Sequence, residues 1–360
     1  MIRDGERTAA MANALQALAP DRFGFRPHLQ GWLRDFPKVG SVAFARLAWP
    51  HNQVHSYDED ASGVVNTNAL SLLVPLQQRV WGFPPEEVVP VNVLSILEDT
   101  GGGIIVAYEE SKGFNAEGWL GFAIGMGTRS GVHYSHMLGV REDVRGIGNL
   151  GWCLKVLQGF LAAESGHHAM TWTFDPMRGA NARLNLEKLG SKMINLTIDK
   201  YGLMRSSLYG DVPTDRFTAY WDLLDFRTHG RLDAVHEGRH VSLEEKDLQS
   251  IPEATVDTLD EVVALSPELV RYRIPGNIDE LMRHEPARAV AWRQEMRQVL
   301  GALMTVRRAE LRSATMQEGP IGVTIGIDPG DYLVEGFSSW IDRESEERVS
   351  YYILRKGEQP

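Results

Sequence analysis

The segment from Val140 to Gly151, which reads V-R-E-D-V-R-G-I-G-N-L-G, constrains the fold more than any other part of this chain. It follows a short apolar run over 137–140 and precedes a run of helical periodicity that extends to about Ser165. A strand, a glycine-rich turn and a helix in this order present backbone N–H groups and the positive end of a helix dipole to a phosphate. The segment therefore predicts a phosphate-binding loop.

Two fingerprints share this loop. A Gly-x-Gly-x-x-Gly spacing begins at Gly146 and is that of a dinucleotide-binding turn, whereas the Arg-x-x-Gly that begins at Arg145 matches most of an acyl-CoA-binding turn. A dinucleotide fold has its glycines directly after a first strand, alternating strands and helices, and an acidic residue after the next strand. Here a gap separates Gly146 from the strand that ends at Val140, and Glu164 falls inside the expected helix. The surrounding pattern favours acyl-CoA.

The elements expected around the loop form a mixed α/β unit. β-branched and alternating runs predict strands over 103–108, 118–126, 132–140, 169–174 and 217–224, of which the first two read as a hairpin. Apolar residues at helical spacing predict helices over 69–81, 150–165 and 180–189. Gly190 then follows as the C-cap of the last of these helices.

Shifts in composition divide the chain into three expected parts. Residues 1–50 form an N-terminal extension with a helix over 8–18, and residues 51–226 form the α/β unit that carries the loop. Polar, weakly periodic sequence then opens a smaller C-terminal α+β domain, 227–360. In this domain we expect a helix over 287–303 and strands over 269–274, 321–327, 332–339 and 349–354.

The bulk properties exclude several classes of partner. A net charge of -11 argues against broad binding of nucleic acid or of an anionic membrane, because both need a basic face. No apolar run approaches the roughly 20 residues of a membrane span. Cys153 is the only cysteine, which fits a reducing compartment, and we expect the protein to be cytoplasmic.

The order of elements and the residues within them resemble the GNAT superfamily of N-acyltransferases. Its pyrophosphate loop is Arg/Gln-x-x-Gly-x-Gly/Ala, and the first and fourth positions match at Arg145 and Gly148, whereas the sixth is Leu150, with Gly151 one step late. Further segments resemble a poorly characterised bacterial subgroup, some relatives of which are associated with N-succinylamino-acid metabolism. They are S-H-M-L-G-V (135–140), T-W-T-F-D-P (171–176), N-A-R-L-N-L-E-K-L-G (181–190) and P-T-D-R (213–216), with weaker similarity at I-P (274–275) and W-R-Q-E-M-R (292–297).

The resemblance implies a mixed, mostly antiparallel twisted sheet flanked by helices, with acyl-CoA (acetyl-CoA or succinyl-CoA) as co-substrate and no metal. In such a fold the strand before the loop binds the pantetheine arm, and an N–H near Leu138 faces the thioester oxygen. The implied cofactor-binding residues are Met137, Leu138, Val140, Arg145, Gly146, Ile147, Gly148, Asn149, Leu150, Gly151 and Asn181. Asn181 serves equally well as a helix N-cap.

The same resemblance implies candidate catalytic residues. Strand alternation places Leu138, His136 and Tyr134 on one face, and the base, or the residue that orders a basic water, is expected at His136 or Tyr134. A packed histidine is the alternative reading of His136. The tyrosine that usually protonates the leaving thiolate is replaced by Leu186, which leaves Tyr201 or a water for this role.

Asp175 completes the set of catalytic candidates. It ends the strand predicted over 169–174, where its carboxylate could either bind a substrate ammonium or cap the following segment.

The expected function is acyl-CoA-dependent N-acyl transfer, with an acetyl or succinyl-like group moving directly to the amine of a small metabolite or amino acid. The expected partner is this small acceptor, with a homodimer as a further expectation, and neither nucleic acid nor membrane is expected. Two alternatives remain: a degenerate GNAT fold that binds acyl-CoA or a protein partner without catalysis, and an NAD(P)-dependent oxidoreductase that uses the three glycines from Gly146 to Gly151.

Overall fold

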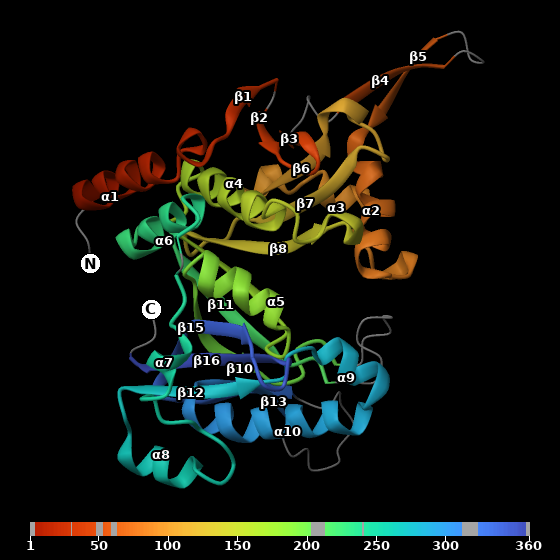
Figure 1. Ribbon diagram of the computed structural model, residues 1–360. Helices are drawn as coiled ribbons and strands as arrows, with labels where there is room; N and C mark the ends of the chain where they lie inside the picture. The colour runs from red at the N-terminus through yellow and green to blue at the C-terminus, as the bar shows by residue number, and fades with distance from the viewer. Residues whose placement is uncertain are drawn as a thin grey trace, which may run out of the picture. The chain divides into compact units, whose positions relative to one another are not determined.

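The computed structural model describes residues 4–29, 31–47, 53–58, 63–202, 213–239, 241–311 and 323–357 (Figure 1). They form two compact units. The first contains the described residues up to Thr171 together with 222–236, and the second contains the rest. The units differ from the domains expected from composition, because residues 4–47 belong to the first unit and the expected boundary at 226/227 falls within a helix.

The sheet of the first unit is mostly antiparallel. Its strands are β1 (Arg26–His28), β2 (Gly31–Phe36), β3 (Gly40–Arg46), β6 (Gly103–Glu109), β7 (Trp119–Met126), β8 (Val132–Val140) and the start of β9 (Ala169–Phe174), in that spatial order. Only β8 and β9 pair in parallel, as a crossover through a helix requires. β4 (Gln53–Asp58) and β5 (Gly63–Asn68) form a separate two-stranded hairpin.

Helices cover both faces of this sheet. The α-helices of the first unit are α1 (Asp4–Ala17), α2 (Leu73–Trp81), α3 (Val91–Leu94), α4 (Leu150–Glu164) and α6 (Phe226–His236). Helix α4 packs on β6, β7 and β8, and eleven of its fifteen residues are buried, as expected for a mainly apolar helix. Helix α2 packs on the opposite face of β8, where Trp81 lies against Gly139. Short 3₁₀ turns occupy 20–23, 69–72, 85–87, 98–100, 110–112 and 142–144.

The second unit has a sheet in the order β11 (Arg216–Asp222), β10 (Lys192–Thr197), β15 (Tyr332–Ile341), β16 (Arg348–Lys356) and β12 (Leu269–Ile274), with antiparallel neighbours. β13 (Val306–Leu311) pairs in parallel with β10 and antiparallel with β14 (Val323–Asp328). Its helices are α5 (Gly179–Ala182), which continues as a π-helical segment over 183–188, α7 (Glu245–Leu248), α8 (Leu259–Leu265), α9 (Ile278–His284) and α10 (Pro286–Leu303).

The mixed α/β fold with a mostly antiparallel sheet is confirmed. The 103–126 hairpin is present as β6 and β7, and Gly190 takes a left-handed φ of +69° after the helical segment. Of the strand expected over 321–327, positions 321 and 322 lie outside the described residues. No helix within the described ranges is long and apolar enough to cross a membrane.

Candidate functional site

The turn between β8 and α4 presents unbonded amides at the start of the helix. Gly146 and Gly148 adopt left-handed φ values of +76° and +60°, which glycine accommodates without strain. The N–H of Ile147 donates to Val144 (3.2 Å), which closes the turn. Within the described chain, the four N–H groups of Gly146, Gly148, Gly151 and Trp152 donate no hydrogen bond to protein. Unpaired amides at a helix N-terminus are what a phosphate requires.

Gly148 allows this turn to pack closely against the sheet. A Cβ atom at Gly148 would lie 2.1 Å from Cδ1 of the buried Phe36 in β2, so any side chain there would push the turn away. At Gly146 a Cβ would meet nothing within 4 Å, which means that the turn is open on that side. One glycine therefore permits close packing, and the other leaves the backbone accessible.

Leu150, the residue that departs from the expected loop pattern, begins α4 with its side chain 5% exposed. Its N–H donates to the carbonyl of Ile147 (3.4 Å). A large residue fits the sixth loop position because its side chain enters the core instead of the open side of the turn. Leu150 thus supports the loop from within, and its expected role as a direct cofactor contact is not favoured by this geometry.

Arg145 donates hydrogen bonds to the backbone of β8 and of α2. Its Nε donates to the carbonyl of Val140 (3.1 Å) and its Nη2 donates to the carbonyl of Val80 in α2 (3.0 Å). The guanidinium forms no ion pair with any described carboxylate, so its positive charge stays uncompensated beside the turn. Arg141, by contrast, forms an ion pair with Asp143.

Strand β8 contains a bulge at His136. Met137 pairs with Ile124 and Ser135 pairs with Gly125, so His136 has no partner on β7. A one-residue bulge reverses the alternation of side chains along a strand. The prediction that Tyr134, His136 and Leu138 share one face is therefore wrong, because Tyr134 and Leu138 lie on opposite faces of the sheet.

The backbone of β8 beyond the bulge has a free edge. The parallel ladder with β9 ends at the pair of Tyr134 and Thr171, and no described residue continues it along 135–140. Arg141 donates its N–H to Leu120 at the end of β7, and backbone groups of successive strand residues point to opposite sides. The N–H of Leu138 therefore points to the free edge, as does the Val140 carbonyl that Arg145 occupies. This is the amide expected to face a thioester oxygen.

His136 is exposed at the bulge, yet desolvation by the surrounding protein lowers the pKa of its imidazole below the ordinary value. The imidazole is consequently neutral at pH 7, which a general base requires. Tyr134 is half-buried on the α2 face of the sheet.

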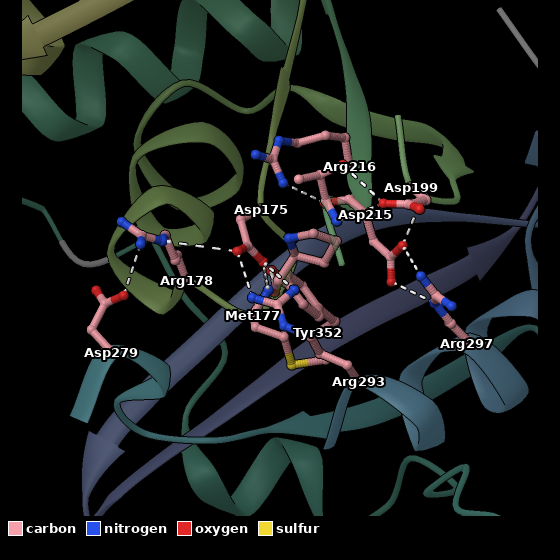
Figure 2. A network of polar contacts seen from close by, with 12 residues as sticks. Asp175, Met177, Arg178, Asp199, Asp215, Arg216, Asp279, Arg293, Arg297 and Tyr352 are labelled. Atoms are coloured by element: carbon pink, nitrogen blue, oxygen red, sulfur yellow. Dashed lines mark hydrogen bonds and ion pairs between the residues drawn. The ribbon is translucent and has the colours of Figure 1, made fainter. Parts of the chain in front are cut away.

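Asp175 lies in the second unit with its side chain fully buried, and Figure 2 shows the groups that contact it. Its oxygens accept hydrogen bonds from Nη1 (3.2 Å) and Nη2 (2.8 Å) of Arg293, and Oδ1 also accepts the N–H of Met177 (2.9 Å). Burial opposes ionisation, but the charge and hydrogen bonds of Arg293 outweigh it, so the pKa of Asp175 is lowered. A buried carboxylate paired in this way cannot bind a substrate ammonium, which corrects that prediction; the capping alternative holds.

Tyr201 also belongs to the second unit. It is 47% exposed, its hydroxyl lies 3.1 Å from Oγ1 of Thr173, and the guanidinium of Arg216 stacks 5.2 Å from its ring centroid. Leu186, at the position of the usual acid, is buried within the π-helical segment. Asn181 is exposed inside α5, whose N-cap is Arg178, so the N-cap alternative for Asn181 is wrong.

The first unit contains a buried polar cluster that was not predicted from the sequence. Lys155 and Gln158, which lie three residues apart in the apolar helix α4, bind Ser135 of β8. His133 lies beside them, and neither of its ring nitrogens has a hydrogen-bond partner among the described residues. The only available signal was two polar residues at helical spacing in an apolar helix. No group of three potential metal-ligating side chains occurs within the described ranges.

His133 should make stability depend on pH. Burial, with smaller contributions from His167 and Lys155, lowers its pKa from 6.5 to about 4. The unfolded chain binds a proton below pH 6.5 that the folded chain binds only near pH 4, so stability is full above pH 6.5 and falls as the pH decreases through this window. We expect a loss of about 3 kcal/mol between pH 6.5 and 4, at 1.36 kcal/mol per unit.

Urea unfolding measured across this range tests the expectation, with His133→Leu as the comparison. In this variant the free energy of unfolding should change much less between pH 6.5 and 4 than in the wild type. If the free energy of unfolding depends on pH in the variant as it does in the wild type, groups other than His133 cause this dependence.

No protein-family model and no curated protein matches the sequence. Among solved structures, the chain resembles a Desulfovibrio desulfuricans protein assigned to the GNAT family of acetyltransferases, at 17% identity and a TM-score of 0.35 over 51% of this chain and 99% of that one. It also resembles an N-acetyltransferase from Staphylococcus aureus (15% identity, 48% of this chain, 99% of that one, TM-score 0.35). An acetyltransferase from Bacillus subtilis in complex with CoA matches at 15% identity, over 35% of this chain and 79% of that one, with a TM-score of 0.28.

Identities and TM-scores this low transfer neither an activity nor a residue's role. The case for function therefore rests on the loop and on strand β8.

Proposed function

We propose that this protein is an acyl-CoA-dependent N-acyltransferase that moves an acetyl or succinyl-like group directly to the amine of a small metabolite or amino acid. One observation carries the proposal: unbonded amides at the start of α4 adjoin a strand whose free edge presents the Leu138 N–H. The turn would bind the pyrophosphate and the strand edge the pantetheine arm of the same ligand. Arg145 adds an uncompensated positive charge beside the turn.

In the proposed reaction, a neutral amine attacks the thioester carbonyl carbon and forms a C–N bond. The carbonyl oxygen becomes an oxyanion, which the N–H of Leu138 stabilises. His136 accepts the proton that the amine nitrogen loses, either directly or through a water. The C–S bond then breaks, and CoA leaves as a thiolate that takes up one proton.

The donor of this last proton is a separate part of the proposal. The expected position holds the buried Leu186, which has no proton to give. We assign the role to a water; Tyr201 remains the candidate that the sequence offered. Tyr201→Phe distinguishes the two, because only a hydroxyl donor makes this variant slower.

The other two functions differ in support. Leu186 favours the non-catalytic acyl-CoA-binding protein, because a binding protein needs no acid. The oxidoreductase has less support: the strands before the loop form an antiparallel meander, and Asp175, the acidic residue after the next strand, is paired with Arg293. We further propose a cytoplasmic location, because Cys153 is the only cysteine of the sequence and no disulfide within the chain is possible.

Release of free CoA thiol from acetyl-CoA and succinyl-CoA across a panel of amines tests the proposed reaction. His136→Ala should lower kcat about 100-fold at pH 7, because a positioned base contributes 10²–10⁴-fold. Since the pKa of His136 is lowered, wild-type activity should reach its plateau near neutral pH and decline in acid, and the variant should lose this acidic limb. His136→Gln serves as the size-matched control and should behave like the alanine variant. An unchanged pH profile in both would remove His136 from the mechanism.

A further inference from the structure

The buried polar cluster beneath β8 contains three residues that bind one another. Ser135 Oγ accepts a hydrogen bond from Lys155 Nζ (2.6 Å) and donates one to Gln158 Oε1 (2.7 Å). All three side chains are buried. Burying a lysine is costly, and this burial lowers the pKa of Lys155 well below its ordinary value. Three apolar side chains would cover the same face of β8 at a lower free-energy cost. The burial of these polar groups therefore has a reason other than stability.

The position of the cluster next to the bulge supplies that reason. The cluster fixes which residue of β8 stands opposite Gly125 on the face that α4 covers. With the bulge at His136, this residue is Ser135. If the bulge moved by one position, His136 would stand opposite Gly125 and Ser135 would leave Lys155 and Gln158. The residues after the bulge would keep their pairing, from Met137 opposite Ile124 onward.

The packing at Gly125 reinforces this choice. A Cβ atom at Gly125 would lie 1.9 Å from Nε2 of His133 and 2.9 Å from Nε2 of Gln158, so these two side chains fill the space above the glycine. An imidazole from His136 could not enter without displacing them. The small hydroxymethyl group of Ser135 fits, and its hydroxyl both accepts and donates a hydrogen bond there.

We propose that Ser135, Lys155 and Gln158 are positioning residues that fix the bulge at His136 and thereby hold His136 in place for acyl transfer. Apolar contacts would tolerate either position of the bulge, whereas hydrogen bonds discriminate between them. Buried polar groups select one register in this way in other proteins, at a cost in stability. The inference rests on the proposed function for its catalytic consequence, but the bulge itself can be observed without activity.

The test compares Ser135→Ala and Lys155→Met with a matched control, Gln77→Met. Gln77 is equally buried, but its side chain binds the backbone of Val89 instead of β8. Amide hydrogen exchange is measured by NMR for residues 135–137 and for β6, together with kcat and the CoA dissociation constant. In the two cluster variants, exchange over 135–137, the residues at and beside the bulge, should accelerate at least tenfold relative to β6. Their kcat should fall about 10- to 100-fold with CoA affinity nearly unchanged, because misplacing reacting groups costs this much.

Gln77→Met should change exchange in both regions equally and leave kcat within about twofold of wild type. The proposal is overturned if the cluster variants behave like Gln77→Met, with uniform exchange. If exchange accelerates only at 135–137 in the cluster variants while the wild-type protein shows no transfer activity, the cluster still fixes the bulge but the proposed reaction is refuted. The two claims can therefore fail separately.

Discussion

Replacing Leu138 by proline should lower kcat by about 100- to 1000-fold, which is the cost of losing one oxyanion-hole donor. Proline lacks the backbone N–H, and that of Leu138 points to the free edge of β8. The substitution removes no bond to β7, and proline is tolerated where a strand's N–H faces away from the sheet. Single-turnover kinetics with saturating acetyl-CoA measures the effect.

Leu138→Ala is the matched control because it shortens the side chain and keeps the N–H. It should retain kcat within about threefold. Circular dichroism and CoA titration should show that the proline variant folds and binds. If Leu138→Pro folds, binds CoA and turns over at the wild-type rate, the N–H of Leu138 is not the oxyanion donor.

Arg293→Met should destabilise the second unit by about 3–5 kcal/mol, the cost of leaving a buried charge without its partner. Arg293 pairs with Asp175 through both terminal nitrogens, and both side chains are almost completely buried. Guanidinium unfolding followed by tryptophan fluorescence, to which the buried Trp221 of the same unit contributes, measures the loss.

Two further variants test this interpretation. Arg288→Met removes an exposed ion pair with Glu285 from the same helix, α10, and should cost at most about 1 kcal/mol. Asp175→Leu combined with Arg293→Met removes both charges and should recover much of the stability. If Arg293→Met proved as mild as Arg288→Met, the account of Asp175 as a structural carboxylate would be wrong.

The sequence predicted the elements around the loop well, because each carried its own local signal. The β-branched run after three glycines became β6, the apolar run after the loop became α4, and Gly190 ended its helical segment as expected. These features depend on periodicity, helix caps and turns, which short stretches of sequence encode.

Other elements depended on contacts between distant segments. β3 lies in the expected N-terminal extension, and its place beside β6 follows from pairing across a gap of about sixty residues in sequence. β10 pairs with three other strands, although its sequence K-M-I-N-L-T is short and mixed. Such strands become ordered only when their neighbours are present, so a local pattern cannot identify them.

Within the candidate site, too, some features could be predicted from local sequence and others could not. The phosphate turn was predictable because its glycines carry the conformation, and the departure at Leu150 was explained once its side chain proved to be buried. The bulge was not predictable from alternation, which is why Tyr134 and Leu138 were assigned to one face. Asp175 was read as a candidate for substrate binding because its partner, Arg293, lies 118 residues away.

The central claim is that the turn from Gly146 to Trp152 and the edge of β8 bind acyl-CoA. Isothermal titration of acetyl-CoA into the wild-type protein, with NADH and NADPH in parallel, tests it most directly. We predict saturable binding of acetyl-CoA with one site per chain and no binding of either nicotinamide nucleotide. Gly148→Ala should weaken the binding at least tenfold, because its Cβ would collide with Phe36 and displace the turn. Binding of NADH or NADPH without binding of acetyl-CoA would contradict the account.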